Sequence, residues 1–278
     1  MQNATMRVLV TGGTGFVGGW TAKAIADAGH SVRFLVRNPA RLKTSVAKLG
    51  VDVSDFAVAD ISDRDSVREA LNGCDAVVHS AALVATDPRE TSRMLSTNMA
   101  GAQNVLGQAV ELGMDPIVHV SSFTALFRPN LATLSADLPV AGGTDGYGQS
   151  KAQIEIYVRD VAALHAALLE SGRGPRRYTA GGHRIPVPEL AKILGEVAGT
   201  TMLAVPVPDS ALRVAGSVLD QAGPYLPFNT PFTAAGMQYY TQMPESDDSP
   251  SEKELGITYR DPRDTVADTV TALRGLGS

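Results

Sequence analysis

Short runs of consecutive apolar residues alternate with longer amphipathic stretches through the first half of the chain. The apolar runs predict β-strands buried on both faces, because such strands are apolar at nearly every position. The stretches between them carry apolar residues at helical spacing and often end at glycine, which predicts helices. We expect strands at Arg7–Thr11, Ser31–Val36, Phe56–Asp60, Asp75–Ala82 and Ile117–Ser122, and helices at Phe16–Gly29, Pro39–Gly50, Ser62–Gly73 and Pro88–Gly113.

This alternation predicts an α/β fold, a doubly wound parallel sheet with helices on both faces. Beyond about Gly172 the alternation becomes irregular, and proline and glycine become frequent. We therefore expect residues 1–172 to form one domain and residues 173–278 a smaller, partly helical substrate-binding region, with some elements returning to the first domain. The acidic stretch Pro244–Gly256 is expected to be an exposed loop with solvated charges that leads into a final helix.

Composition narrows the classes of partner. With 278 residues, 44% of them hydrophobic, the chain can bury a sizeable core. A net charge of −5 without a long basic run argues against nucleic acid, and no apolar run approaches the ~20 residues of a membrane helix. The lone cysteine, Cys74, excludes an internal disulfide and is expected in the core, and the stretch MQNATM is too short and polar for a signal peptide. We expect a cytoplasmic protein; a homodimer is compatible with the sequence.

The glycine-rich stretch TGGTGFVGG follows the first strand directly and opens the first helix. Glycine permits the tight turn and lets backbone N–H groups approach a pyrophosphate, whose negative charge the helix N-terminus favours. Because this turn opens a βαβ series, it predicts a Rossmann-type dinucleotide site. The residues expected to contact the cofactor here are Gly12, Gly13, Thr14, Gly15, Phe16, Val17 and Gly18.

The end of the second strand bears on the choice between NAD and NADP. A carboxylate there would bind the ribose 2′-OH of NAD, but the strand is followed by Arg37 and Asn38. The planar guanidinium of Arg37 suits a 2′-phosphate, which favours NADP over NAD, unless Arg37 is merely a solvated charge. After the third strand, Asp60 and Ile61 are expected at the adenine, although Asp60 could equally cap the next helix.

Tyr147 and Lys151 lie four residues apart and therefore share one face of a helix. A nearby ammonium is expected to lower the pKa of the tyrosine, and the same lysine can bind the nicotinamide ribose. Ser122 follows the fifth strand, at the sheet edge where ligands of such folds bind. Its hydroxyl can orient a carbonyl beside the tyrosine, which donates the proton in a hydride transfer.

The stretches TGGTGFVGGW, VVHSAA, TNMAGAQNVL, VHVSS and YGQSK together resemble the extended short-chain dehydrogenase/reductase family. The resemblance covers about Met6–Arg159 and is nearest the branch of dihydroflavonol reductases and 3β-hydroxysteroid dehydrogenases. It implies a triad of Ser122, Tyr147 and Lys151, with Ser121 as the weaker serine candidate. It also gives Asn98 a mainly structural role, and it places a further group beside the cofactor: His79, Ser80, Ala81 and Ala82.

The stretch Tyr147–Glu170 continues helix-like without a turn residue. In the family that the chain resembles, a sixth strand and a segment of the substrate pocket follow the Tyr-Lys helix. Neither has a visible counterpart here. We therefore expect several tens of residues to be missing near Ile156–Asp160, and the alternative is one continuous helix from Tyr147 to Glu170.

The long segment between Ser122 and Tyr147 suggests an apolar carbonyl substrate, because it contains several large apolar residues, although they could equally pack against the smaller region. Pro224–Phe232 is a further candidate wall. His119 is expected to be a core histidine, and no metal site is expected. The apolar residues between Ser122 and Tyr147 are Leu126, Phe127, Leu131, Leu134 and Leu138.

The leading function is an NADP-dependent reductase or alcohol dehydrogenase. The alternatives are an NAD-dependent sugar-nucleotide epimerase or dehydratase and a non-catalytic dinucleotide sensor.

Overall fold

The computed structural model describes residues 4–85, 88–143, 145–166, 176–223, 230 and 232–276. The chain divides into two compact units. The first unit comprises Met1–Leu126 and Val140–Pro175, and the second comprises Phe127–Pro139 and Arg176–Ser278. The domain boundary expected near Gly172 lies outside the described residues and stays a prediction.

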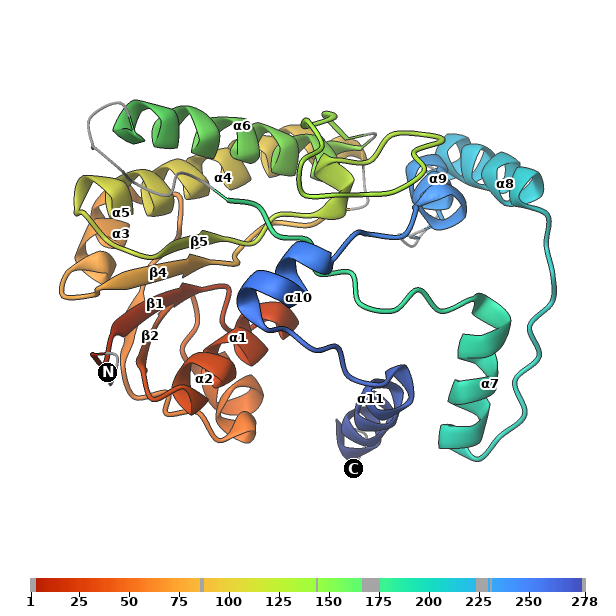
Figure 1. Ribbon diagram of the computed structural model, residues 1–278, viewed down its shortest axis with the longest axis horizontal. Coiled ribbons are helices and arrows are strands. Elements are labelled where there is room, and N and C mark those ends of the chain that lie inside the picture. Colours follow the sequence, from red (N-terminus) through yellow and green to blue (C-terminus); the bar gives the residue numbers. More distant parts are fainter. Residues whose placement is uncertain are drawn as a thin grey trace. The chain divides into compact units, whose positions relative to one another are not determined.

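The first unit is built on a parallel sheet of five strands, which confirms the predicted α/β fold class. The strand order is β3-β2-β1-β4-β5, so the chain starts in the middle of the sheet and winds to both sides of it (Figure 1). The carboxyl ends of all five strands meet at one edge, where such sheets bind ligands. The strands are β1 (Arg7–Thr11), β2 (Ser31–Val36), β3 (Phe56–Val58), β4 (Ala76–His79) and β5 (Ile117–His119).

All five strands lie where the sequence predicts them, but the last three end two or three residues earlier, so Asp60, Ser80 and Ser122 stand in loops rather than in strands. The expected helices are also present, and two of them are divided. A 3-10 turn follows α2, and a π-helical turn at Gln103–Gly107 separates α4 from α5. The helices of this unit are α1 (Phe16–Asp27), α2 (Ala40–Ser45), α3 (Arg64–Leu71), α4 (Thr91–Ala102), α5 (Gln108–Glu111) and α6 (Gly146–Ala166).

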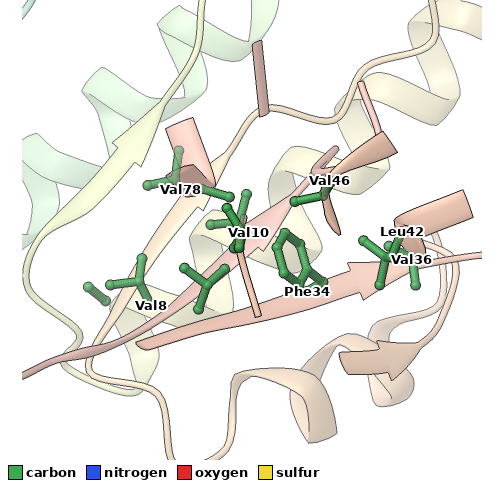
Figure 2. Close-up of a cluster of buried hydrophobic side chains, with 11 residues drawn as sticks. Val8, Val10, Phe34, Val36, Leu42, Val46 and Val78 are labelled. Atoms are coloured by element: carbon green, nitrogen blue, oxygen red, sulfur yellow. The ribbon is translucent and has the colours of Figure 1, made fainter. Parts of the chain in front are cut away.

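Successive strand residues supply two separate cores, one on each face of the sheet. Val8 and Val10 of β1 point to the face covered by α1 and α2, where Phe34 is fully buried (Figure 2). Leu9 points to the opposite face, among residues of α3 and of the turn that follows α4. A strand that is apolar on both sides requires such double cover, which fixes β1 at the centre of the sheet.

Helix α6 carries the Tyr-Lys pair and packs against α4, with which it runs along one face of the sheet (Figure 1). It continues without interruption from Gly146 to Ala166. The structure therefore contradicts the break expected at Ile156–Asp160 and agrees with the alternative of one continuous helix as far as Ala166. Within the described residues, the sheet has no strand beyond β5.

The second unit is helical in its described part, apart from one isolated bridge between Leu134 and Ser246. Helix α8 packs against α9, and α7 packs against α11. The expectation of an exposed loop at Pro244–Gly256 is wrong in part, because α10 occupies much of it. Asp248 within it is buried, and its carboxylate accepts hydrogen bonds from two backbone N–H groups. The helices are α7 (Val187–Ala198), α8 (Asp209–Ala222), α9 (Ala234–Gln242), α10 (Ser249–Leu255) and α11 (Pro262–Leu276).

Candidate active site

The turn between β1 and α1 admits no side chains at its key glycines. A Cβ on Gly12 would lie 2.7 Å from the backbone nitrogen of Ala81, and one on Gly18 would lie 2.3 Å from the carbonyl oxygen of Gly12. Gly12 also has a φ of 73°, in the left-handed region. The turn is closed by a hydrogen bond from Gly15 N–H to the Gly12 carbonyl, 2.9 Å long. Glycine is thus required here by close backbone approach.

The N-terminus of α1 is open to a ligand. Its N-cap is Gly15, which has no side chain to bind the first N–H groups of the helix. Phe16 and Val17 in the first turn are 77% and 52% exposed, although both are apolar. Free N–H groups at a helix N-terminus after a glycine turn fit the pyrophosphate of a dinucleotide. The residues predicted to hold the cofactor at this turn therefore have suitable geometry.

At the predicted adenosine end, Arg37 stands just after β2 with 77% of its side chain exposed. Its Nη1 lies 4.0 Å from a carboxylate oxygen of Asp60. Hydrogen bonds from the side chain and backbone of Ser62 lower the pKa of Asp60. Asp63, not Asp60, caps α3, so that alternative for Asp60 is wrong. The contacts of Asp60 and Ile61 with adenine remain predictions.

The loop after β4 is tied to β1 by one hydroxyl. Thr11 Oγ1 lies 2.8 Å from Nδ1 of the buried His79 and accepts a hydrogen bond from the backbone N–H of Ala81. Ser80 N–H in turn donates to the carbonyl of Thr11. These bonds hold Ser80 and Ala81 against the glycine turn, where a cofactor contact is predicted for them and for Ala82.

Asn98 of α4 joins the loop after β4 to the start of α6. Its side-chain amide exchanges two hydrogen bonds with the backbone of Leu83 and donates a third to Ser150 Oγ. The asparagine is 1% exposed. This arrangement agrees with the structural role that the resemblance implies for it, because it fixes the helix turn that carries Tyr147.

Tyr147 and Ser122 face each other. Burial raises the pKa of Tyr147, the nearby Ser122 hydroxyl acts to lower it, and Asp145 acts to raise it. The expectation that Lys151 lowers the pKa of this tyrosine is therefore not met: in this environment the phenol is held in its protonated form. Ser122 Oγ also accepts a hydrogen bond of 2.9 Å from the hydroxyl of Thr124, a residue that sequence reasoning missed.

Lys151 lies on the same face of α6 as Tyr147, with Nζ 5.9 Å from the centre of the tyrosine ring. The lysine is 2% exposed, and Nζ donates a hydrogen bond of 2.7 Å to the carbonyl of Val120. Burial lowers its pKa to about 8, and Glu155 acts to raise it. The ammonium is thus charged at neutral pH.

The structure distinguishes the two adjacent serines. Ser121 Oγ donates a hydrogen bond of 2.5 Å to the carboxylate of Glu155, whereas Ser122 faces Tyr147. This supports Ser122 as the catalytic candidate. Sequence reasoning missed Glu155, although its position four residues after Lys151 places it on the same helix face.

Much of the segment expected to line an apolar substrate pocket is used for packing. Leu126, Phe127 and Leu134 are each at most 2% exposed, and the ring of Phe127 meets the ring of Tyr239 edge to face. All three side chains are thus buried, and Phe127 packs within the second unit as the alternative proposed. The other candidate wall, Pro224–Phe232, lies largely outside the described residues.

Residues 8–183 match the model of the NAD dependent epimerase/dehydratase family, which is more than half of the chain. The chain belongs to this family. The Rossmann-type fold and the predicted membership of the extended short-chain dehydrogenase/reductases are thereby confirmed. Among the described residues, no helix is both long and apolar enough to span a membrane.

Curated relatives of the family carry several activities in their names. Cinnamoyl-CoA reductase 1 of Petunia hybrida is 35% identical over 127 residues, which cover 44% of this chain and 37% of the relative. A UDP-glucose 4-epimerase of Neisseria meningitidis is 32% identical over 165 residues, 55% of this chain and 48% of the relative. The chain thus spans less than half of either relative. Sterol demethylase protein B of Methylococcus capsulatus is 23% identical over 330 residues, 98% of this chain and 99% of the relative.

Two solved structures resemble the chain over nearly its whole length. That of gox2253 has a TM-score of 0.74 at 24% identity and covers 99% of both chains. That of UDP-glucose 4-epimerase from Bifidobacterium longum, in complex with NAD+ and UDP, has a TM-score of 0.67 at 19% identity and covers 94% of this chain and 96% of the other. At these identities the likeness shows the fold alone.

Proposed function

We propose that the chain is an NADP-dependent oxidoreductase that interconverts a carbonyl and a secondary alcohol on a small substrate. The observation that carries the proposal is the placement of Tyr147 beside Ser122, with Lys151 Nζ 5.9 Å from the centre of the tyrosine ring. These residues lie beyond the carboxyl end of β5, on the sheet edge that also carries the glycine turn. A proton donor and an orienting hydroxyl are what hydride transfer to a carbonyl requires from the protein.

Each side chain has a separate task in the reaction. The nicotinamide, when bound, supplies the hydride. Ser122 holds the carbonyl oxygen, and Tyr147 donates its proton to that oxygen as negative charge develops on it. A tyrosine phenol is protonated at neutral pH, and burial raises the pKa of Tyr147 further, so the proton is present for donation. The buried ammonium of Lys151 favours the phenolate that this donation leaves behind.

The preference for NADP rests on the end of β2. Arg37 is exposed and 4.0 Å from its nearest carboxylate partner, so its guanidinium can turn to a 2′-phosphate. No acid follows β2 directly in the sequence. The apolar character of the substrate remains a proposal, with weaker support now that three of the apolar residues are used in packing.

An epimerase or dehydratase acting on a sugar nucleotide is the second candidate. It is favoured by the likeness to the Neisseria UDP-glucose 4-epimerase, which is similar in extent to the likeness to the reductase. The same Tyr147 would serve such a reaction, so activity measurements must separate the two.

Substitution of Tyr147 by phenylalanine tests the proposal. We expect the wild-type protein to oxidise NADPH with members of a panel of ketones and aldehydes. Tyr147→Phe should lower kcat by about 100-fold or more, because it removes the proton donor, while NADPH binding measured by fluorescence persists. Tyr157→Phe, in the same helix, is the matched control and should retain activity.

Three outcomes would contradict the reductase. Turnover of UDP-glucose alone would favour the epimerase. Binding of the cofactor without turnover of any carbonyl or sugar nucleotide would favour the sensor. Substantial activity in Tyr147→Phe would exclude the tyrosine as the acid.

A further inference from the structure

The positively charged side chain of Lys151 is buried away from water. It is 2% exposed, and its Nζ bonds to the Val120 carbonyl. An ammonium taken out of water is costly unless an opposite charge compensates it. The groups around it therefore decide whether it stays charged.

The two histidines near Lys151 supply no such compensation. The rings of His79 and His119 stack with their centres 5.7 Å apart. Burial, His119 and Lys151 all lower the pKa of His79, and burial and then Lys151 lower the pKa of His119 to about 3. Both rings are thus neutral at physiological pH. Neither ring nitrogen of His119 has a hydrogen-bond partner among the described residues.

Glu155 acts against burial and raises the pKa of Lys151. It stands one turn after Lys151 on α6, is 7% exposed, and accepts the hydrogen bond of 2.5 Å from Ser121. We propose that Glu155 is a positioning residue of the Tyr147 site, which compensates the buried ammonium of Lys151 and, through Ser121, holds the segment that follows β5 against α6. Its significance for catalysis rests on the proposed function.

The hydrogen bond between Ser121 and Glu155 also affects Ser122. Ser122 follows Ser121 directly and faces Tyr147 on α6, one face of which also carries Glu155. Two successive serines thus meet the same helix at points two turns apart, and Ser121 is hydrogen-bonded to it. The Ser121 bond limits the motion of the backbone that presents Ser122, so a catalytic hydroxyl depends on a residue that does not touch the substrate.

Direct titration of Lys151 tests whether Glu155 compensates the charge of its ammonium. NMR of protein labelled with 13C at the lysine Cε carbon follows each ammonium with pH, and Lys151→Met assigns the signal. We expect a midpoint near 8 in the wild type. In Glu155→Gln, which keeps an acceptor for Ser121 but removes the charge, the midpoint should fall by roughly one unit or more. Glu69→Gln, an exposed glutamate of α3, is the matched control and should leave it unchanged.

An unchanged midpoint in Glu155→Gln, or an equal fall in Glu69→Gln, would overturn the proposal. Because this measurement needs no turnover, it decides the role of Glu155 even if no carbonyl substrate is found. In the active enzyme, the same substitution should move the basic limb of the pH profile to lower pH, which a purely structural glutamate would not do.

Ser121→Ala tests whether the hydrogen bond from Ser121 to Glu155 holds the segment after β5 against α6. This variant can be measured even if Glu155→Gln does not fold. Losing a hydrogen bond to a carboxylate should speed amide hydrogen exchange at Val120 and Ser122 roughly tenfold. Exchange in β1 serves as the internal reference and should stay as in the wild type. Equal amide exchange rates at Val120 and Ser122 in the variant and the wild type would show that the bond from Ser121 to Glu155 does not hold this segment.

Discussion

At the scale of single residues, the site depends on which atom each hydroxyl faces. Ser121 and Ser122 are chemically identical neighbours, yet one bonds to Glu155 and the other faces Tyr147. The phenol of Tyr147 is protonated at neutral pH, and burial raises its pKa further. The site therefore starts from a neutral acid, which suits reduction of a carbonyl better than oxidation of an alcohol.

Arg37 carries the residue-scale prediction about the cofactor. The wild type should bind NADPH more tightly than NADH, because the guanidinium can pair with the 2′-phosphate. In Arg37→Ala the affinity for NADPH should fall roughly tenfold or more, with little change for NADH, as measured by fluorescence titration. Arg41→Ala, four residues further on, is the control. A wild type that prefers NADH, or an unchanged preference in Arg37→Ala, would show that Arg37 is only a solvated charge.

At the scale of elements, the β1–α1 turn and α6 bring the two halves of the site together. The turn brings an uncapped helix N-terminus to the sheet edge, and α6 presents Tyr147, Lys151 and Glu155 along one face. α6 is fixed through Asn98 and through packing against α4. Helix packing thus positions Tyr147 and Lys151, the candidate catalytic groups of α6.

The glycine turn gives a prediction at this scale. In Gly18→Ala the new methyl group would overlap the Gly12 carbonyl, and neither backbone segment can yield easily. We expect the free energy of unfolding to fall by about 1–3 kcal/mol, with loss of dinucleotide binding. Gly223→Ala, where a Cβ meets nothing within 4 Å, is the control for urea denaturation. Wild-type stability and binding in Gly18→Ala would refute the close approach.

At the scale of the whole molecule, the chain is shorter in its interior than a relative that it matches from end to end. The alignment with sterol demethylase protein B extends over 330 positions and nearly the whole of both chains, whereas this chain has 278 residues. Several tens of positions of that alignment therefore have no counterpart here.

Within the second unit, the carboxylate of Asp248 accepts hydrogen bonds from the backbone of Gly181 and Gly182. Burial acts to raise the pKa of Asp248, but hydrogen bonds outweigh it and the pKa is lowered. The resulting stabilisation is present above the ordinary pKa of 3.8 and is lost as pH falls through the lower folded-state value. Asp248→Ala leaves the N–H groups of Gly181 and Gly182 without their acceptor, so the free energy of unfolding at pH 7 should fall by about 1.5–3 kcal/mol.

Urea denaturation at several pH values checks this prediction. The difference between Asp248→Ala and the wild type should shrink as the pH falls below 3.8. Asp137→Ala, an exposed aspartate of the same unit, should behave as the wild type. A difference that is independent of pH would show that the carboxylate charge does not matter.

The sequence by itself determined the five strands, the glycine turn and the shared face of Tyr147 and Lys151, because apolar periodicity and helical spacing are local properties of the chain. Only the tertiary structure decided which serine faces Tyr147, that Asp63 rather than Asp60 caps α3, and that α6 runs on through Ile156. It also revealed the buried carboxylates of Glu155 and Asp248. These features depend on which distant backbone or side chain lies opposite a polar group, and on how far burial removes that group from water, and neither is encoded in the spacing of residues along the chain.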